Sequence, residues 1–410
     1  MKYGLLGKTL GHSLSPKIHG LFADYSYELF EREEDQIEEL LADPKIQGLN
    51  VTIPYKETVL KFCNTLTDRA RSIGCVNTIV IDKNRQITGD NTDFYGFDYL
   101  LERMEIPHGK DLGIIIGDGA TSKTVSAVLR HRGIPFVILS RSTKPFLSDA
   151  KAYAHGTILI NTTPVGMYPH NGKTALSLDP FPKLKAVVDV IYNPLRSELL
   201  LQAKERGIPY SGGLPMLVAQ AKAAAELFTG TKISDEKTEE VLRQLQQESQ
   251  NIVLVGMPGS GKTTVGKRVA KLTGKTFIDL DHEIVRRERR SIPQIFEESG
   301  EAHFRKLERQ VTEELGKKLG VVLATGGGVI LDPRNKHPLA QNGRIYWIDR
   351  NIKKLATKDR PLSKNQNSLF KMYRIRKPKY RDFADVYLRN VRFNVTAERI
   401  VEDFYENTDD

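Results

Sequence analysis

Residues 251–264 read NIVLVGMPGSGKTT, and this stretch decides the fold of the second half of the chain. The apolar run Ile252 to Val255 leads into the pattern G-x-x-x-x-G-K-T of Gly256 to Thr263, and a helical pattern follows. A strand, a glycine loop and a helix in this order form a phosphate-binding loop. We expect the pattern by chance in about one or two of a hundred random chains of this length, so the match predicts a nucleotide site.

The part of the chain before this loop is long enough for domains of its own. The chain has 410 residues, more than one hydrophobic core normally supports, so two or three domains are expected. Short β-type runs alternate with amphipathic helical patterns throughout, which predicts an α/β fold with parallel sheets. Ser234 gives a capping signal for a polar helix within residues 233–250, and little linker, about residues 248–251, separates the two halves.

Composition and charge narrow the class of partner. Apolar residues make up 40% and aromatic residues 8% of the chain, as in ordinary globular proteins. The net charge of +10 fits either a nucleic-acid surface or a set of anionic ligands. Basic residues are interspersed with acidic ones, and no run combines dense Lys and Arg with stacking aromatic residues. Anionic small molecules are therefore the better interpretation, and no nucleic-acid partner is expected.

Targeting signals are missing from the sequence. No run approaches about 18 consecutive apolar residues, and the first residues, MKYGLLG, lack the long apolar stretch of a signal peptide. We therefore expect a cytoplasmic protein with no membrane partner. Cys63 and Cys75 belong to no CxxC motif and pair with no histidine, so we interpret both as core thiols.

Two polar clusters in the first half point to a small-molecule site. In GHSLSP, residues 11–16, the hydroxyls of Ser13 and Ser15 face the same way if the backbone is extended, and both could then bind one ligand carboxylate. Lys56 ends the segment NVTIPYK and Asp93 ends GDNTD; in a closed pocket such a pair can exchange a proton with a substrate oxygen. Taken alone, each cluster is explained more simply by a serine turn capping a helix, a surface lysine or a turn aspartate.

A third cluster is typical of a dinucleotide site. The buried-strand run Ile114 to Ile116 leads into the glycine turn of residues 117–122, and a helical pattern follows. Such a turn binds pyrophosphate, because backbone amides and the helix dipole both favour an anion. The next apolar run, residues 136–139, ends in Ser140, Arg141 and Ser142, where an NAD-selective site would carry Asp or Glu. Arginine at this place favours a 2′-phosphate and hence NADP.

The ordered set of segments in residues 3–247 resembles shikimate dehydrogenase. The segments are SLSP at 13–16, NVTIPYK at 50–56, CVNT at 75–78, NTD at 91–93, NTTPVGM at 161–167, DVIYNP at 189–194 and GLPMLVAQA at 213–221. The resemblance implies a substrate lobe of residues 1–95, to which the helices of about 213–247 return, and a Rossmann-like NADP lobe of residues 96–212. It also implies reversible reduction of 3-dehydroshikimate to shikimate by NADPH, with Lys56 as proton donor and acceptor beside Asp93.

The same resemblance implies which residues bind the ligands. Two departures from the family pattern, Asp118 in place of a small apolar residue and Pro145 in place of a basic one, bear on how strictly NADP is preferred over NAD. The implied substrate-binding residues are Ser13, Ser15, Thr52, Lys56, Asn77, Asp93, Tyr192 and Gln220. The implied NADP-binding residues are Gly117, Asp118, Gly119, Ala120, Thr121, Ser140, Arg141, Ser142, Lys144, Val190 and Gly213.

Motifs after the phosphate-binding loop indicate what the nucleotide acts on. Asp279 and Asp281 stand two residues apart at the end of the expected strand FIDLD, so both should face one side, where one could hold magnesium through water and the other a hydroxyl. The segments EAHFRKLE at 301–308, ATGGG at 324–328, DRPL at 359–362 and RKPKY at 376–380 follow. Singly, such patterns also occur at strand ends, in flexible turns and on solvated helix faces.

In combination these motifs resemble shikimate kinase over nearly all of residues 251–410. The resemblance implies a P-loop kinase domain in which two arginines clamp the shikimate carboxylate and Asp281 orients or deprotonates the attacking hydroxyl. The implied shikimate-binding residues are Asp281, Arg305, Gly327 and Arg376. The implied ATP-binding residues are Gly259, Ser260, Gly261, Lys262, Thr263, Thr264 and the lid residue Arg360, and Thr263 with Asp279, through water, would hold Mg²⁺. The lid is short, since 16 positions separate Arg360 from Arg376.

Our hypothesis from the sequence is a bifunctional enzyme of chorismate and aromatic amino-acid biosynthesis. It makes shikimate from 3-dehydroshikimate with NADPH and phosphorylates it with Mg-ATP to shikimate 3-phosphate. One alternative is an NAD-linked quinate/shikimate dehydrogenase fused to the kinase, which Arg141 argues against. Another is a regulator that keeps both folds as ligand sensors, which the intact Lys56, Asp93 and Lys262 argue against. Oligomeric state and channelling stay open.

Overall fold

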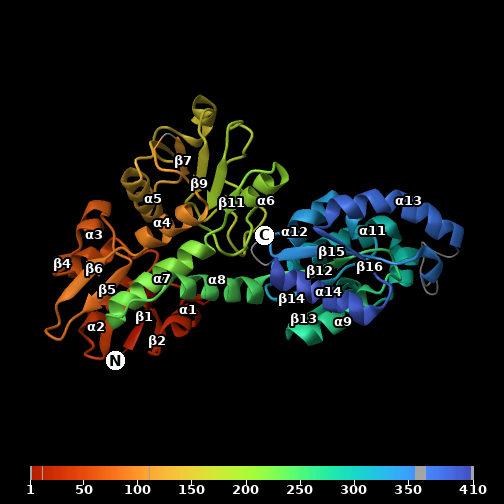
Figure 1. Cartoon of the computed structure of the whole chain (residues 1–410), viewed down its shortest axis with the longest axis horizontal. Helices are drawn as coiled ribbons and strands as arrows, with labels where there is room; N and C mark the ends of the chain where they lie inside the picture. The colour runs from red at the N-terminus through yellow and green to blue at the C-terminus, as the bar shows by residue number, and fades with distance from the viewer. Residues whose placement is uncertain (1, 12, 110, 356–365, 408–410) are drawn as a thin grey trace. The chain divides into compact units, whose positions relative to one another are not determined.

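The computed structural model describes residues 2–11, 13–109, 111–355 and 366–407. Within this part of the chain the strands form three sheets (Figure 1), and the predicted α/β class with parallel sheets is confirmed. Contacts divide the chain into two compact units. The first is Met1–Met167, Lys173–Asn193 and Gln202–Leu242, and the second is Tyr168–Gly172, Pro194–Leu201 and Arg243–Asp410. Two short segments of the region expected to form the NADP lobe thus cluster with the second unit.

The first sheet of unit 1 has six strands in the order β2-β1-β3-β5-β6-β4. Its strands are β1 (Lys2–Gly7), β2 (Tyr27–Glu31), β3 (Ile46–Val51), β4 (Thr65–Leu66), β5 (Thr78–Ile81) and β6 (Ile87–Asp90). The strands β2, β1 and β3 are parallel, whereas β5 runs antiparallel to both β3 and β6. The helices of this part are α1 (Ser15–Phe22), α2 (Ile37–Ala42) and α3 (Asp68–Ile73).

The second sheet of unit 1 is entirely parallel, in the order β11-β10-β9-β7-β8. Its strands are β7 (Gly113–Ile116), β8 (Phe136–Leu139), β9 (Ile158–Asn161), β10 (Ala186–Asp189) and β11 (Tyr210–Ser211). The helices of this region are α4 (Asp93–Arg103), α5 (Ala120–His131) and α6 (Glu198–Glu205). Every residue of β7, β9 and β10 is buried, as expected for a parallel sheet with helices on its faces.

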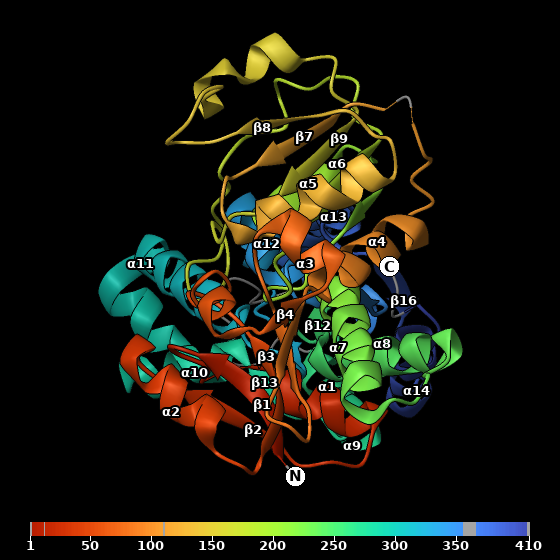
Figure 2. The same cartoon turned by 90° about the vertical axis from the view of Figure 1, so that its left-hand side faces the viewer.

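Helices α4 and α7 (Leu214–Thr229) pack along each other between the two sheets of unit 1 (Figure 2). The approach is close because α4 carries a glycine at the contact. A Cβ atom added at Gly96 would lie 2.4 Å from the carbonyl oxygen of Met216 and 3.0 Å from Cβ of Gln220. Gln220 can therefore occupy this position only because residue 96 of α4 is a glycine, which has no side chain.

The third sheet belongs to unit 2 and is also parallel, in the order β13-β14-β12-β15-β16. Its strands are β12 (Asn251–Val255), β13 (Thr276–Asp279), β14 (Val321–Ala324), β15 (Gly343–Asp349) and β16 (Val386–Arg389). The helices are α9 (Lys262–Thr273), α10 (Leu280–Glu288), α11 (Ile292–Leu315), α12 (Lys336–Ala340), α13 (Gln366–Phe383) and α14 (Phe393–Glu406). Helix α8 (Asp235–Ser249) lies within the predicted range 233–250, and Ser234 Oγ accepts the amide of Lys237 at 3.2 Å.

Strand β12 and the segment after it carry the predicted strand, loop and helix. All five residues of β12 are buried, and the chain then turns through Gly256, Gly259 and Gly261, each with positive φ, before α9 begins at Lys262. A side chain at Gly256 would meet the carbonyl oxygen of Ile348 at 2.3 Å. No helix within the described part of the chain is long and apolar enough to span a bilayer.

Replacement of Gly96 by alanine should destabilise unit 1, although alanine is the better helix former. Overpacking against a backbone carbonyl costs about 1–3 kcal/mol, which exceeds the gain in helix propensity. The matched control is Gly20→Ala in α1, where an added Cβ meets nothing within 4 Å. That change should be neutral or stabilise by up to about 1 kcal/mol.

The measurement is urea unfolding followed by circular dichroism. The single tryptophan, Trp347, lies in β15 and its fluorescence reports separately on unit 2. Equal effects of the two glycine substitutions would contradict the packing argument.

Candidate active sites

Lys56 and Asp93 meet in a largely buried ion pair in unit 1. Nζ of Lys56 lies 2.5 Å from Oδ2 of Asp93, and the two side chains are 13% and 10% exposed. Lys56 follows β3, and Asp93 is the first residue of α4, where the helix dipole favours a carboxylate. The lysine is therefore not a surface residue, and its catalytic role stays a prediction.

A second buried cluster brings together Asn77 and Gln220, which are far apart in the sequence. Nδ2 of Asn77 donates to Oε1 of Gln220 at 3.4 Å and to Oγ1 of Thr92 at 3.1 Å. Oδ1 of Asn77 accepts the amide of Thr92 at 2.6 Å. Since Thr92 directly precedes Asp93, the cluster fixes the start of α4 and with it the ion pair.

No role was predicted for Tyr27, yet its hydroxyl extends this cluster. The Tyr27 hydroxyl donates to Oδ1 of Asn50 at 2.8 Å, and Nδ2 of Asn50 donates to Oγ1 of Thr78 at 3.1 Å. Burial raises the pKa of Tyr27 well above its usual value, while a hydrogen bond with Ser15 lowers it. His19 stacks on Tyr27 with 4.0 Å between ring centroids, and burial lowers the pKa of His19 to about 3. The imidazole is thus neutral at physiological pH.

The backbone at Ser13 and Ser15 is not extended. The expectation that both hydroxyls face the same way depended on an extended backbone, so that condition is not met. Leu14 has helical dihedral angles, and α1 begins at Ser15. Oγ of Ser13 accepts the amide of Ser15 at 3.2 Å. The reason is Pro16, which favours the first turn of a helix and so ends the extended segment early. Ser15 is buried and Ser13 half-buried.

The remaining predicted substrate residues lie on separate segments of unit 1. Thr52 follows β3 and donates its amide to the carbonyl of Leu6, and Tyr192 follows β10, where burial raises its pKa. The hydrogen bonds found among the described residues join Lys56 with Asp93, Asn77 with Gln220 and Ser13 with Ser15. They do not join Thr52 or Tyr192 to these pairs.

The predicted dinucleotide turn connects β7 to α5 and has the shape that an anion needs. Gly117 has φ of 106°, and an added Cβ there would meet Cγ2 of Thr163 at 2.8 Å. Gly119 is the N-cap of α5, and the space over its Cα is open to 4 Å. The amides of Ala120 and Thr121 begin the helix, so a pyrophosphate fits against an uncovered helix N-terminus. Gly213 caps α7 against Val190, whose carbonyl oxygen an added Cβ would meet at 2.0 Å.

The loop after β8 folds back on Ser140. Its Oγ accepts the amides of Ser142 at 3.1 Å and Thr143 at 2.8 Å. Arg141 and Lys144 are exposed in this loop. The side chain of Asp118 turns toward the same loop, and its Oδ2 accepts the hydroxyl of Ser142 at 2.5 Å. This hydrogen bond lowers the pKa of Asp118, which is therefore ionised at neutral pH.

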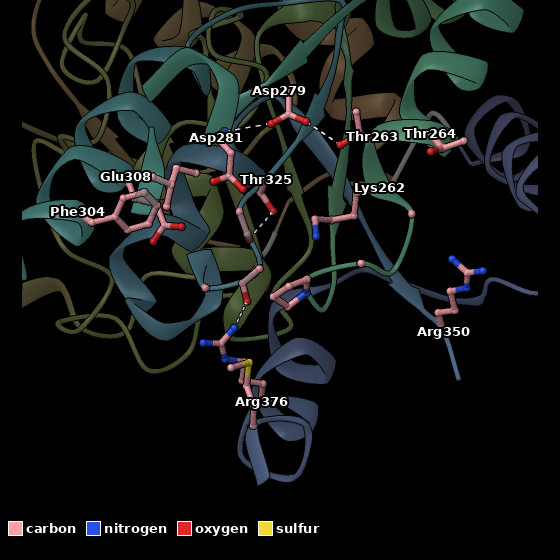
Figure 3. A pocket seen from close by; sticks show the side chains of 18 of the residues that line it. Lys262, Thr263, Thr264, Asp279, Asp281, Phe304, Glu308, Thr325, Arg350 and Arg376 are labelled. Carbon is pink, nitrogen blue, oxygen red and sulfur yellow. Dashed lines mark hydrogen bonds between the residues drawn. The ribbon is translucent and has the colours of Figure 1, made fainter. Parts of the chain in front are cut away.

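In unit 2 the predicted nucleotide and substrate residues line one cavity of about 480 Å³ (Figure 3). The predicted residues that line it are Gly259, Gly261, Lys262, Thr263, Thr264, Asp279, Asp281, Arg305, Gly327 and Arg376. Ser260, within the loop, is fully buried, and its hydroxyl has no hydrogen-bond partner among the residues that the structure describes. Arg360 lies outside the described residues.

The phosphate-binding loop is closed over Lys262. Its Nζ donates to the carbonyls of Gly256 at 2.9 Å and Met257 at 3.2 Å. Gly261 has φ of 99°, and a Cβ there would meet the ring of Phe393 at 2.5 Å. The ammonium group is thus held at the centre of the loop, where it can reach a bound phosphate. The loop fits a nucleoside triphosphate because the Lys262 ammonium group lies beside a cavity that can hold one.

The prediction that Asp279 and Asp281 end one strand was wrong. Strand β13 ends at Asp279, which caps α10 by accepting the amides of Asp281 at 3.1 Å and His282 at 3.3 Å. A capping aspartate stabilises a helix start, so the strand ends two residues earlier than expected and Asp281 lies in α10. The other oxygen of Asp279 accepts the hydroxyl of Thr263 at 2.7 Å. These two hard oxygen groups suit Mg²⁺.

The three glycines at 326–328 line the cavity and leave no room for a side chain. An added Cβ at Gly326 would lie 2.7 Å from Oδ1 of Asp281, and one at Gly328 would lie 2.2 Å from Nη1 of Arg305. The carbonyl of Gly327 accepts Nη1 of Arg376 and the hydroxyl of Tyr380, both at 2.7 Å. This segment therefore contacts Asp281, Arg305 and Arg376, all of which line the cavity; Asp281 and Arg376 are labelled in Figure 3.

Glu308 is a buried carboxyl group that the sequence interpretation left without a role. Its side chain is 2% exposed and lines the cavity beside Asp281 and Arg305. Nη1 of Arg305 donates to Oε2 of Glu308 at 2.7 Å. Burial raises the pKa of Glu308 to about 6, against the opposing effect of Arg305. Its spacing from Arg305, one helical turn, is the sequence signal that could have identified it.

The far end of the cavity also contains groups that were not predicted. The Arg350 guanidinium lies 4.9 Å from the centre of the Phe393 ring, and both residues line the cavity. Phe393 is the first residue of α14, well after the motifs in the sequence. No local pattern marks this pairing, because it joins the end of β15 to the start of α14.

Comparison with family models finds two matches. Residues 5–79 match the shikimate dehydrogenase substrate binding domain, and residues 258–407 match shikimate kinase. The second match covers the cavity of unit 2, and the first covers the segments of Ser13, Ser15, Thr52, Lys56 and Asn77.

Comparison with individual proteins gives the same result for the first part. The NADP(+) shikimate dehydrogenase of Clostridium beijerinckii is 38% identical over 58% of this chain and 95% of its own. A chorismate mutase/shikimate 5-dehydrogenase fusion from Clostridium acetobutylicum is 31% identical, with a TM-score of 0.57 over 60% of this chain and 97% of its own. The shikimate 5-dehydrogenase of Thermus thermophilus, solved with NADP(H) and shikimate, is 29% identical, with a TM-score of 0.55 over 60% and 99%. The chain belongs to the shikimate dehydrogenase family, and a shikimate kinase domain follows the dehydrogenase part.

Proposed function

We propose that the chain catalyses two consecutive reactions of chorismate and aromatic amino-acid biosynthesis. The first part reduces 3-dehydroshikimate to shikimate with NADPH, reversibly, and the second phosphorylates shikimate to shikimate 3-phosphate with Mg-ATP. The observation that carries this proposal is that each half of the chain contains an assembled set of reacting groups. The first half has the buried Lys56–Asp93 pair, and the second has a phosphate-binding loop that shares a cavity with Asp281, Arg305 and Arg376.

In the dehydrogenase part, Lys56 holds the proton that the reaction needs. Bound NADPH supplies a hydride to the substrate carbonyl carbon. The carbonyl oxygen then takes a proton from Nζ of Lys56, which Asp93 keeps oriented at 2.5 Å. Asn77 and Gln220, held to each other by a hydrogen bond, would bind substrate hydroxyls, and Ser13 and Ser15 would bind its carboxylate.

In the kinase part, the two ends of the cavity bind the two reactants. Lys262 and the loop amides would bind the nucleotide phosphates, and Thr263 with Asp279 would hold Mg²⁺. Arg305 and Arg376 would bind the shikimate carboxylate, which places its ring beside Asp281. Asp281 would then orient the attacking hydroxyl and take its proton. The role of Arg360 as a lid residue stays a prediction.

The alternatives receive less support than this proposal. The relatives from Clostridium beijerinckii and Clostridium perfringens are named as NADP(+) enzymes, which does not favour an NAD-linked enzyme. The assembled ion pair and phosphate-binding loop do not favour a ligand-sensing regulator. The cytoplasmic location and the lack of nucleic-acid and membrane partners remain predictions.

The purified chain, given 3-dehydroshikimate, NADPH and Mg-ATP, should consume NADPH and form shikimate 3-phosphate. Without Mg-ATP the reaction should stop at shikimate. The products are resolved by chromatography and the NADPH loss by absorbance. A preparation that leaves NADPH unchanged would disprove the first half of the proposal.

Substitution Lys56→Met should separate the two activities. Loss of the proton donor lowers the reductase kcat by about a hundredfold to ten-thousandfold. Phosphorylation of added shikimate should be unchanged, because Lys56 lies in unit 1. The matched control is Lys61→Met, since Lys61 is 58% exposed and forms a surface ion pair with Glu34.

The reciprocal change is Lys262→Met in the phosphate-binding loop. It should lower the kinase kcat by about a hundredfold or more, because it removes a charge aimed at the transferring phosphoryl group. Reduction of 3-dehydroshikimate should be unchanged. Lys271→Met, an exposed lysine in the last turn of the same helix, serves as control. Loss of both activities in Lys262→Met would contradict two separate sites.

Glu308 should make the stability of unit 2 depend on pH. Its pKa is about 6 in the folded chain against 4.5 for the free group. The folded state therefore binds this proton more tightly than the unfolded state. The resulting stability is fully present below pH 4.5 and is lost as the pH rises through about 6, at most about 2 kcal/mol in total.

Urea unfolding followed by Trp347 fluorescence between pH 4.5 and 7 measures this effect. Glu308→Gln should remove that part of the pH dependence, whereas Glu301→Gln, which removes the more exposed partner of Arg305, should keep it. An unchanged pH profile in Glu308→Gln would show that another group titrates.

A further inference from the structure

Asp118 sits at an unexpected place in the dinucleotide turn. It lies between Gly117 and Gly119, where the chain passes from β7 to α5, and its side chain is exposed. The carboxylate contacts the loop after β8, where its Oδ2 accepts the hydroxyl of Ser142 at 2.5 Å and lies 3.5 Å from Oγ1 of Thr143.

The loop after β8, which the Asp118 carboxylate contacts, is the loop expected to distinguish NADP from NAD. In Rossmann-type domains the residues after the second strand contact the 2′ position of the adenosine ribose. Here that strand is β8, and the loop is drawn tight because Ser140 Oγ accepts the amides of Ser142 and Thr143. The hydroxyl of Ser142 and, less closely, that of Thr143 are thus directed at a negative charge of the protein itself.

The basic residues of this loop are not neutralised in the same way. Arg141 and Lys144 are exposed, and within the described part of the chain neither forms an ion pair or hydrogen bond that the structure records. A 2′-phosphate bound at this loop would therefore lie near two cations, Arg141 and Lys144, and one carboxylate, that of Asp118. At such short range, a like charge opposes the phosphate even when solvent reduces the effect.

We propose that Asp118 is a specificity-determining residue that occupies the seat of the cofactor 2′-phosphate and so reduces the preference for NADP over NAD. NADP⁺ has to displace the carboxylate from Ser142 and bind beside its charge, whereas NAD⁺ carries no phosphate there. This inference rests on the proposed dehydrogenase function. The inference predicts that the preference for NADP over NAD is smaller than it would be if Arg141 acted without Asp118 nearby.

The test is isothermal titration of the full chain with NADP⁺ and with NAD⁺, in saturating Mg-ADP so that the kinase site is filled. Asp118→Asn keeps the size of the side chain and removes its charge. It should lower the Kd for NADP⁺ by about tenfold at low salt and leave the Kd for NAD⁺ within about twofold. The gain should shrink as ionic strength rises, because salt screens the repulsion.

Two further variants complete the design. Asp118→Ala should give the same direction, since it also frees the hydroxyl of Ser142. Asp179→Asn removes one exposed carboxylate elsewhere in unit 1, where Asp179 pairs with Arg206, and should alter neither Kd. Unchanged melting temperatures would show that the fold is intact.

The other outcomes are equally informative. An unchanged or weaker affinity for NADP⁺ in Asp118→Asn would overturn the inference, and so would a matching loss for NAD⁺, which would mean that Asp118 binds the ribose hydroxyl. If the wild-type chain bound both dinucleotides and Asp118→Asn had no effect, only this inference would be wrong. If it bound neither, the proposed dehydrogenase function would fail as well.

Discussion

A parallel strand that ends in a glycine turn and continues as a helix organises both parts of the chain. Such a turn leaves the first amides of the helix without partners, and they need an anion, a cap or water. In unit 1 this arrangement is β7, residues 117–119 and α5; in unit 2 it is β12, residues 256–261 and α9. The rest of each site is placed relative to these amides.

Both sites also bury charge, and each does so with a partner. Lys56 is matched by Asp93, and Glu308 is matched by Arg305. A buried charge without a partner is costly, so each charge needs its partner close by. Gly96 and the glycines at 326–328 let backbone or charged groups approach more closely than any side chain would allow.

The sequence predicted the α/β class, the phosphate-binding loop and the residues that line the cavity of unit 2, because these depend on contiguous motifs. It was wrong where one residue ended an element early. Pro16 starts α1 and so removes the extended segment at Ser13, and Asp279 caps α10 and so places Asp281 on a helix. Both are local effects that a periodicity argument does not resolve.

Other features were beyond reach because they depend on distant segments. The contact of Asn77 with Gln220 spans 143 positions, and the approach of Arg350 to the Phe393 ring joins the end of β15 to the start of α14. The direction of the Asp118 side chain depends on the loop after β8, more than 20 residues away. Sequence spacing indicates that such groups exist but not which of them meet.

The packed glycines at 326–328 restrict how this site can change over time. Because no side chain fits at any of the three positions, single substitutions there cannot enlarge, narrow or recharge the substrate end of the cavity without moving Asp281, Pro258 or Arg305. New substrate preferences would have to arise from α11 and α13, which line the cavity with ordinary side chains. Among descendants of this chain, residues 326–328 should therefore stay glycine. Variation in the pocket should accumulate on α11 and α13.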